Sequence, residues 1–451
     1  MKKLTSKKQI ILYAMGGMGV NMLNLIVGTY LCDALMVEGF DVNVENWTYA
    51  NKTLIVAAVW SVMILVSKVL DGVIDIPFAA WTDNLKSKWG RRRPAILLGL
   101  IPMIIAFVLF LNPISNETES LANTIYLGIV LCIFYTFYTL TMVTYYATFS
   151  EIVDNDRDRV LLSNFKSVFD VVYFVLGYAL IPAMVGSVNI RVIGYIFLPL
   201  VLTMLIPLFM IKEKSSLPQD TEETEKAKMV NLVESVKYAF KNKSFIIWMG
   251  IYMVMQFGVQ MFLSGQNVYL SGVSKFEGWM VTVLNALSFA PVPFTLILYN
   301  KIINKKGFKP AFRFTMFMFT LGMIVMTFTN ASWISNLTVR FIIGIVASLL
   351  CSFAIGSFFS IGYIVPSFLA VKEEKETGIS HPAMYFAIQG LASGIATGLS
   401  TGIVWVNLKD GGNTYLMGIV VAISCIITVL LTIFMPKSLN DVGKVEKNES
   451  K

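Results

Sequence analysis

Charged side chains are scarce in this sequence, and their scarcity excludes a soluble globular protein. Only 14% of the 451 residues are charged, against about 25% in soluble proteins, and 56% are hydrophobic. The charges form short clusters separated by apolar runs of about 20 residues, the length that a helix needs to cross a bilayer. The sequence therefore predicts an all-α polytopic membrane protein.

Cysteine and histidine are also sparse, which argues against metal and disulfide chemistry. The chain has one histidine and four cysteines, and the cysteines lie in or at the ends of apolar runs without CxxC spacing. We interpret the cysteines as small packing residues. We expect no cofactor, and no metal beyond a possible sodium ion.

Twelve apolar segments are long enough to span a membrane. They are 9–32, 53–81, 94–112, 122–149, 166–187, 191–211, 244–271, 279–300, 310–329, 333–363, 382–408 and 413–435. A polar connection over 212–243 divides them six and six, so we expect six-helix bundles over 1–211 and 244–436 and a tail over 437–451. This layout is typical of the major facilitator fold, with its two bundles around a central cavity.

Lysine and arginine are distributed asymmetrically along the chain. With the N-terminus inside, thirty of the 36 lie in inner segments or within four residues of one, four lie in or directly beside outer loops, and two lie deeper within spans. Because positive residues concentrate on the cytoplasmic side, both termini are expected there, in a multi-pass protein of the inner (cell) membrane. The net charge of +8 therefore reflects topology and contact with membrane lipid, and we expect no nucleic acid partner.

The second span carries three ionisable residues at membrane depth: Lys68, Asp71 and Asp75. Their spacing places both carboxylates on one face of a helix, with Lys68 one turn before Asp71. Such residues are costly in a bilayer and usually face an internal cavity, where two carboxylates can hold a small hard cation or share a proton. The alternative is a structural ion-pair network that holds this helix to a neighbour.

A basic loop follows the second span on the cytoplasmic side. It reads W-T-D-N-L-K-S-K-W-G-R-R-R-P from Trp81 to Pro94. Positive-inside charge alone explains the arginines, but not the order of an acid, a glycine and a basic cluster. We expect a gating or structural role for these loop residues, which are Asp83, Gly90, Arg91, Arg92 and Arg93.

The run from Lys68 to Leu98 resembles the glycoside–pentoside–hexuronide:cation symporters, the melibiose-permease family of the major facilitator superfamily. Weaker similarity extends over most of the chain. It covers Tyr13, Gly16, Gly19 and Asn21 in the first span, the loop 154–166, and the segment 372–386 entering the eleventh span. The resemblance implies a secondary transporter that couples cation and solute movement by alternating access.

The resemblance also implies a cation site. The two carboxylates of the family match Asp71 and Asp75, and a threonine of its fourth helix matches Thr139, while Lys68 is expected to balance their charge. Where sodium-binding relatives have an asparagine, this chain has Ile74, which removes one oxygen ligand. The coupling ion is therefore expected to be a proton or sodium. The loss of the oxygen favours the proton, because a proton needs only a carboxylate whereas sodium prefers several oxygen ligands.

The substrate site departs further from the family. The helix-one aspartate aligns with Asn21, the stacking aromatic with Tyr146, and an arginine with Lys166. Met142 and Gly394 stand where the family has a second aspartate and a lysine. These two replacements argue against a melibiose-like substrate. Polarity at membrane depth adds four candidate substrate contacts, which are Asp170, Gln256, Gln260 and Gln389.

These features predict a symporter of a sugar, glycoside or uronide that functions as a monomer and is not an enzyme. Two alternatives remain open at this level. The same fold could carry a lysolipid-like or other non-sugar amphiphile. A membrane prenyltransferase also places two aspartates four residues apart, but it needs a second acidic cluster and about nine spans.

Overall fold

The computed structural model is all-helical in the part of the chain that it describes. The described residues are 3, 4, 6–83, 85–150, 152, 153, 156–215, 240–377, 382–436 and 439. They contain no β-strand and include twelve helices long and apolar enough to cross a membrane. The predicted fold class is confirmed, and every span begins and ends within six residues of its predicted bounds.

The spans follow the chain from one end to the other. They are Lys7–Ala34, Ala57–Phe78, Arg92–Phe110, Leu121–Ala147, Val168–Val185, Ile190–Met210, Lys243–Val273, Gly278–Lys306, Phe308–Thr327, Leu337–Phe358, Ile388–Asp410 and Thr414–Phe434.

The chain forms two compact units. Unit 1 comprises residues 1–38 and 43–225, and unit 2 comprises residues 39–42 and 226–451. The predicted linker is described only at its two ends, because 216–239 lie outside the described residues, and the predicted tail only at Leu439. The predicted domain bounds therefore stay predictions.

Unit 1 holds the first six spans. Its helices are α1 (Lys7–Ala14), α2 (Gly17–Leu25), η1 (Ile26–Leu31), α3 (Cys32–Ala34), α4 (Val44–Trp47), α5 (Ala57–Asp83), α6 (Arg92–Phe110), α7 (Leu121–Ala147), η2 (Thr148–Ser150), α8 (Asp156–Val175), η3 (Leu176–Leu180), α9 (Ile181–Val185), α10 (Ile190–Phe197), η4 (Leu198–Met204) and α11 (Leu205–Met210).

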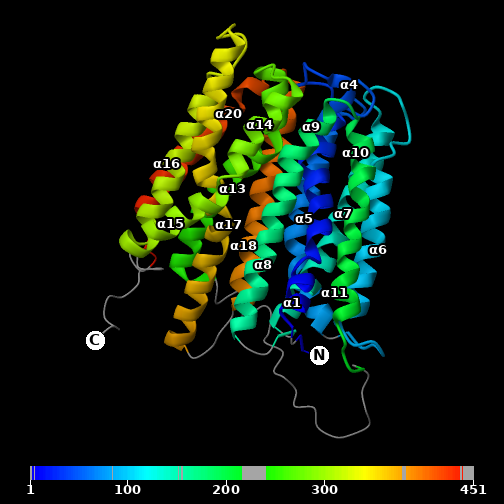
Figure 1. Ribbon diagram of the computed structural model, residues 1–451, viewed down its shortest axis with the longest axis vertical. Coiled ribbons are helices and arrows are strands. Elements are labelled where there is room, and N and C mark those ends of the chain that lie inside the picture. Colours follow the sequence, from blue (N-terminus) through cyan, green and yellow to red (C-terminus); the bar gives the residue numbers. More distant parts are fainter. Residues whose placement is uncertain are drawn as a thin grey trace, which may run out of the picture. The chain divides into compact units, whose positions relative to one another are not determined.

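Small residues allow the helices of unit 1 to approach closely. α7 packs against α5 and α6, and these helices run along one another in Figure 1. A side chain on Gly99 of α6 would meet the Thr141 backbone nitrogen of α7 at 2.9 Å. Since lipid tails are as apolar as the helices, association in a bilayer depends on such close packing rather than on the hydrophobic effect.

Unit 2 holds the last six spans. Its helices are α13 (Lys243–Val268), η5 (Tyr269–Val273), α14 (Gly278–Phe289), α15 (Val292–Lys306), α16 (Phe308–Thr327), α17 (Leu337–Thr377), α18 (Pro382–Thr397), η6 (Gly398–Trp405), α19 (Val406–Asp410), η7 (Thr414–Leu416), α20 (Met417–Leu431) and η8 (Thr432–Phe434).

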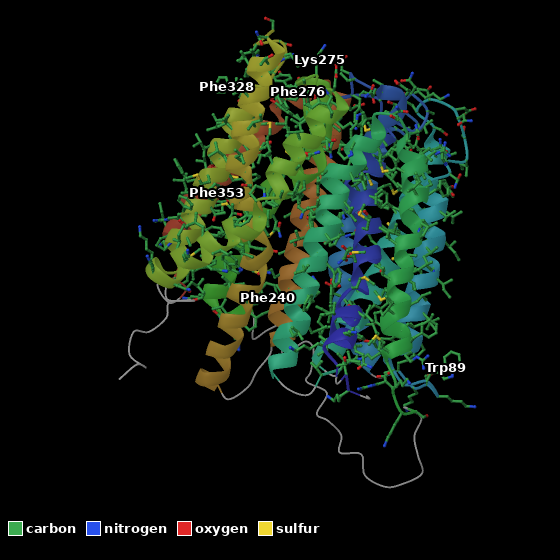
Figure 2. The ribbon with its side chains drawn as sticks, in the orientation of Figure 1. Trp89, Phe240, Lys275, Phe276, Phe328 and Phe353 are labelled. Atoms are coloured by element: carbon green, nitrogen blue, oxygen red, sulfur yellow. The ribbon has the colours of Figure 1, made fainter. Side chains whose placement is uncertain are left out.

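Unit 2 is packed in the same way. α16 contacts both α17 and α20, and Gly322 of α16 lies so close to Cys351 of α17 that a side chain would meet its backbone nitrogen at 3.1 Å. Lys275, labelled in Figure 2 beside Phe276, follows η5 and forms an ion pair of 2.8 Å with Asp41 of the segment 39–42.

Four spans contain a π-helical turn: η1 and η3 in unit 1, and η5 and η6 in unit 2. They fall in the first, fifth, seventh and eleventh spans, which are equivalent positions of two six-span halves. The two halves therefore share an architectural repeat that their residues do not reveal. π-turns leave backbone groups without their usual partners and often occur at functional positions.

Candidate functional site

Helix α5 presents the carboxylate pair. Lys68, Asp71 and Asp75 recur at intervals of three and four residues, so they share one face of the helix, and all three are half-buried. Thr139 of α7 is buried, and its Oγ1 donates a hydrogen bond to Oδ1 of Asp71. The structure therefore brings together Asp71, its neighbour Asp75 and Thr139. The Asp75 carboxylate forms no hydrogen bond with another described residue.

Lys68 does not pair directly with these carboxylates. Its Nζ lies 3.7 Å from the centroid of the Tyr135 ring, and among the described residues no ion pair within 4.0 Å joins it to Asp71 or Asp75. Asp71 and Lys68 still interact electrostatically. The ammonium thus lies near Asp71 without forming an ion pair with either carboxylate.

A second polar cluster lies on α2, α7 and α8 of the same unit. Tyr138 Oη donates to Asn21 Oδ1 at 3.1 Å, and Asn21 Nδ2 donates to Tyr146 Oη at 3.4 Å. Lys166 and Asp170, one turn apart on α8, form an ion pair, and Asn21 interacts electrostatically with Asp170. The four substrate candidates predicted in unit 1 are therefore in mutual contact.

Tyr146 is the most open member of this second cluster. Its side chain is 37% exposed, and Lys166 Nζ lies 5.1 Å from its ring centroid. An exposed tyrosine ring flanked by hydrogen-bonding groups can stack on the apolar face of a sugar ring, whose hydroxyls then meet the flanking groups.

Tyr138 belongs to the second cluster and also interacts with the first. It hydrogen-bonds Asn21 and interacts electrostatically with Asp71, Asp75 and Asp170. The sequence interpretation considered Tyr138 as a weaker candidate for sugar contact, beside Tyr146, and it missed Tyr135. The signal for both was their position on the helix that carries Thr139, with Tyr135 one turn before it on the same face.

The candidates in unit 2 lie elsewhere. Gln389 is buried, and it accepts from Trp248 Nε1 at 3.0 Å while donating to the Gly362 carbonyl at 2.6 Å. Gln256 Nε2 donates to Tyr252 Oη at 2.6 Å, whereas Gln260 is half-buried on the same helix. Substrate contact by these three amides stays a prediction.

The basic loop after the second span packs against other residues of unit 1. Gly90 has a φ of +85°, and a side chain there would collide with Glu213. Glu213 Oε2 accepts from the backbone nitrogen of Arg92 at 2.8 Å, which places a negative charge at the start of α6 where the helix dipole favours it. Arg92 is buried, with Nη1 lying 3.4 Å from Thr82 Oγ1.

The other loop candidates differ in placement. Arg91 and Arg93 are half-buried, and the side chain of Asp83 lies outside the described part. Trp89 is 63% exposed and points away from the unit in Figure 2. The sequence interpretation missed Glu213, which lies more than 100 residues from the loop and carries no local signal.

The positions that depart from the resembled family also differ in their surroundings. Met142 is buried on α7, where a side chain on Gly17 would meet its Cε at 3.1 Å. It therefore fills space between α7 and α2 instead of offering a carboxylate. Gly394 lies on α18 in unit 2 and is half-buried.

Twelve membrane-spanning helices with half-buried ionisable clusters among them are typical of a polytopic transport protein, here one of the major facilitator fold. A model of the family described as MFS/sugar transport protein matches residues 12–436, and the chain belongs to this family. Family membership in a class of transporters removes the prenyltransferase alternative.

Relatives with shorter matches are named as symporters. The chain is 27% identical over 160 residues to the "uncharacterized symporter YnaJ" of Bacillus subtilis. This match covers 35% of this chain and 30% of that protein. It is also 25% identical over 127 residues to the "inner membrane symporter YicJ" of Escherichia coli. This second match covers 28% of this chain and 27% of that protein. The matched stretches thus span less than a third of each relative's length.

Solved structures show the same fold at low sequence identity. A D-xylose-proton symporter aligns with a TM-score of 0.65 and 15% identity over 98% of this chain and 99% of that chain. The nucleoside transporter NupG aligns with a TM-score of 0.59 and 15% identity over 96% and 99%.

Proposed function

We propose that the protein is a monomeric symporter of the inner cell membrane that couples the entry of a neutral, hydroxyl-rich solute of the glycoside class to a proton or sodium ion. The observation that carries this proposal is the pair of polar clusters in unit 1. A carboxylate pair without an ion-pair partner within 4.0 Å among the described residues lies on α5, and Tyr138, which interacts electrostatically with it, hydrogen-bonds a cluster of amide, phenol and charged groups on α2, α7 and α8.

The coupling ion binds at Asp71 and Asp75 in this proposal. The Thr139 hydroxyl donates its hydrogen to Asp71, so its lone pairs remain available to a cation. Ile74 supplies no oxygen between the carboxylates, which favours a proton over sodium because sodium prefers several oxygen ligands. An ion that binds this site and a solute that binds the adjacent cluster influence each other reciprocally, which is the thermodynamic requirement for coupling.

The substrate is neutral in this proposal because the charges of the second cluster are already paired. Lys166 is joined to Asp170, so the cluster has no spare cation for the carboxylate of a uronide. Its remaining groups are the amide of Asn21 and the phenols of Tyr138 and Tyr146, which donate to and accept from hydroxyls. The family description and the symporter names of the relatives support this class.

The test is uptake into proteoliposomes under an imposed sodium gradient and, separately, a pH gradient. The labelled panel contains neutral glycosides, a uronide, a nucleoside and a lysolipid. We expect a neutral glycoside to accumulate with one of the two gradients. Accumulation of the uronide alone would refute the neutral substrate, and accumulation of the lysolipid alone would replace the sugar class with the amphiphile.

A variant tests the carboxylate role directly. Asp71→Asn keeps the side-chain shape but removes the charge, so gradient-driven uptake should fall to the background of empty liposomes. Glu117→Gln, an exposed carboxylate of the same unit, is the matched control and should keep uptake. Ion-driven uptake that survives in folded Asp71→Asn protein would exclude this carboxylate as the coupling site.

A further inference from the structure

Tyr135 lies between the carboxylate helix and the π-turn of the first span. Its side chain is 1% exposed, and its ring contacts the Lys68 ammonium at 3.7 Å. Its hydroxyl has no hydrogen-bond partner among the described residues, and a side chain on Gly28 of η1 would lie 3.2 Å from that hydroxyl. The glycine therefore gives the ring the room that it occupies.

The position of Lys68 needs an explanation. A lysine one turn before an aspartate on a helix readily forms an ion pair with it, and burial in a membrane protein strengthens that attraction. Lys68 instead lies over an aromatic face, where a desolvated ammonium is also stabilised. The groups that face it electrostatically are Asp71 on its own helix and Cys32 at the end of the first span.

We infer that Tyr135 is a positioning residue for the coupling ion: its ring holds the Lys68 ammonium away from Asp71 and Asp75, so that their oxygens stay open to the ion. This inference rests on the proposed function. Without the ring, the lysine reaches Asp71 and competes with the coupling ion. A contact of this kind changes the apparent ion affinity by about 10-fold.

The first experiment compares Tyr135→Leu, which removes the ring, with Tyr135→Phe, which keeps it. Uptake by the full-length protein in proteoliposomes is measured against sodium concentration and against pH. We expect the leucine variant to need about 10-fold more sodium for half-maximal uptake, or to have its pH midpoint lowered by about one unit if the proton is the ion. The phenylalanine variant should stay near wild type, and maximal uptake should change less than the midpoint in both.

Controls separate this role from a purely structural one. Tyr126→Leu removes a tyrosine from the same helix that donates only to the Leu109 carbonyl, and it should not move the ion midpoint. In a Lys68→Met background, adding Tyr135→Leu should have no further effect on the ion midpoint, because the competing ammonium is gone.

A steric variant tests the position of the ring without removing it. Gly28→Ala places a methyl group against the Tyr135 hydroxyl and should shift the ion midpoint in the same direction. Adding Tyr135→Phe removes the hydroxyl, makes room for the methyl group and should restore the midpoint. This pair keeps the inference testable if Tyr135→Leu does not fold.

The outcomes distinguish the inference from the function on which it rests. Equal ion midpoints in the leucine and phenylalanine variants, with wild-type uptake still ion-dependent, would overturn the role of Tyr135 and leave the symport proposal standing. Wild-type uptake that ignores both gradients would overturn ion coupling, and the inference with it.

Discussion

The hydrogen bond from Thr139 to Asp71 offers the sharpest test of the ion site. Thr139→Val keeps the branched shape of the side chain and removes only the hydroxyl. Because Thr139 is buried and its partner is a carboxylate, the lost bond is of the charge-assisted kind, worth about 1.5–3 kcal/mol. This corresponds to about 10- to 100-fold in the equilibrium that depends on the ionised carboxylate.

The direction of the effect identifies the ion. If sodium couples, the variant loses an oxygen ligand and a stabiliser of the carboxylate, so half-maximal uptake should need at least about 10-fold more sodium. If a proton couples, loss of a donor to the carboxylate favours protonation, so the pH midpoint of uptake should rise by about one unit or more. Tyr135→Leu lowers that same midpoint, so the two variants move a proton-coupled transporter in opposite directions.

The assay is initial-rate uptake into proteoliposomes at fixed solute concentration, with sodium varied at constant pH and then pH varied without sodium. Thr144→Val on the same helix is the matched control, because its hydroxyl donates only to the Leu140 carbonyl one turn earlier. If Thr139→Val and Thr144→Val give the same ion and pH midpoints as wild type, Thr139 contributes nothing to the ion site and the reasoning fails.

Two further substitutions test the packing of unit 1 and the charge pair. Gly90→Ala should lower the melting temperature, since it combines a left-handed φ, costing about 1–2 kcal/mol, with a collision against Glu213. Gly412→Ala, whose φ is +69° with open space around it, should lose less, and an equal loss would remove the role of Glu213. Lys166→Met leaves Asp170 half-buried without its partner and should lower stability and abolish uptake, whereas adding Asp170→Leu should recover stability without uptake. Both tests use thermal melting and uptake, and full uptake in the Lys166→Met, Asp170→Leu double variant would show that the substrate cluster does not need this ion pair.

Much of the fold could be predicted because membrane insertion depends on local composition. The bilayer selects any apolar run of sufficient length as a helix, so twelve spans follow from hydropathy within a few residues. The placement of Asp71 beside Asp75 also follows locally, since a helix brings residues four apart onto one face. The contact of Asp71 with Thr139 came from the family pattern, because the two lie 68 residues apart.

The remainder of the site depends on contacts that no local signal encodes. Lys68 could equally have paired with Asp71 on its own helix, and only the packing of α7 against α5 presents the Tyr135 ring to it. Glu213 contacts the start of α6, although it lies 121 residues after Arg92 in the sequence. The π-turns likewise require the backbone itself, because an insertion within a helix leaves hydropathy unchanged.

The sequence by itself determined the number of spans and the helix that carries the two carboxylates, because bilayer thickness and helical periodicity act over a few neighbouring residues. The orientation of the spans stays a prediction from the distribution of positive charge. Only the tertiary structure decided which groups meet across helices: the Lys68 ammonium and the Tyr135 ring, Tyr138 and Asn21, and Glu213 and the start of α6. These contacts depend on side-chain packing between distant segments. In a bilayer that packing depends on close fit and hydrogen bonds rather than on apolarity, and hydropathy does not record it.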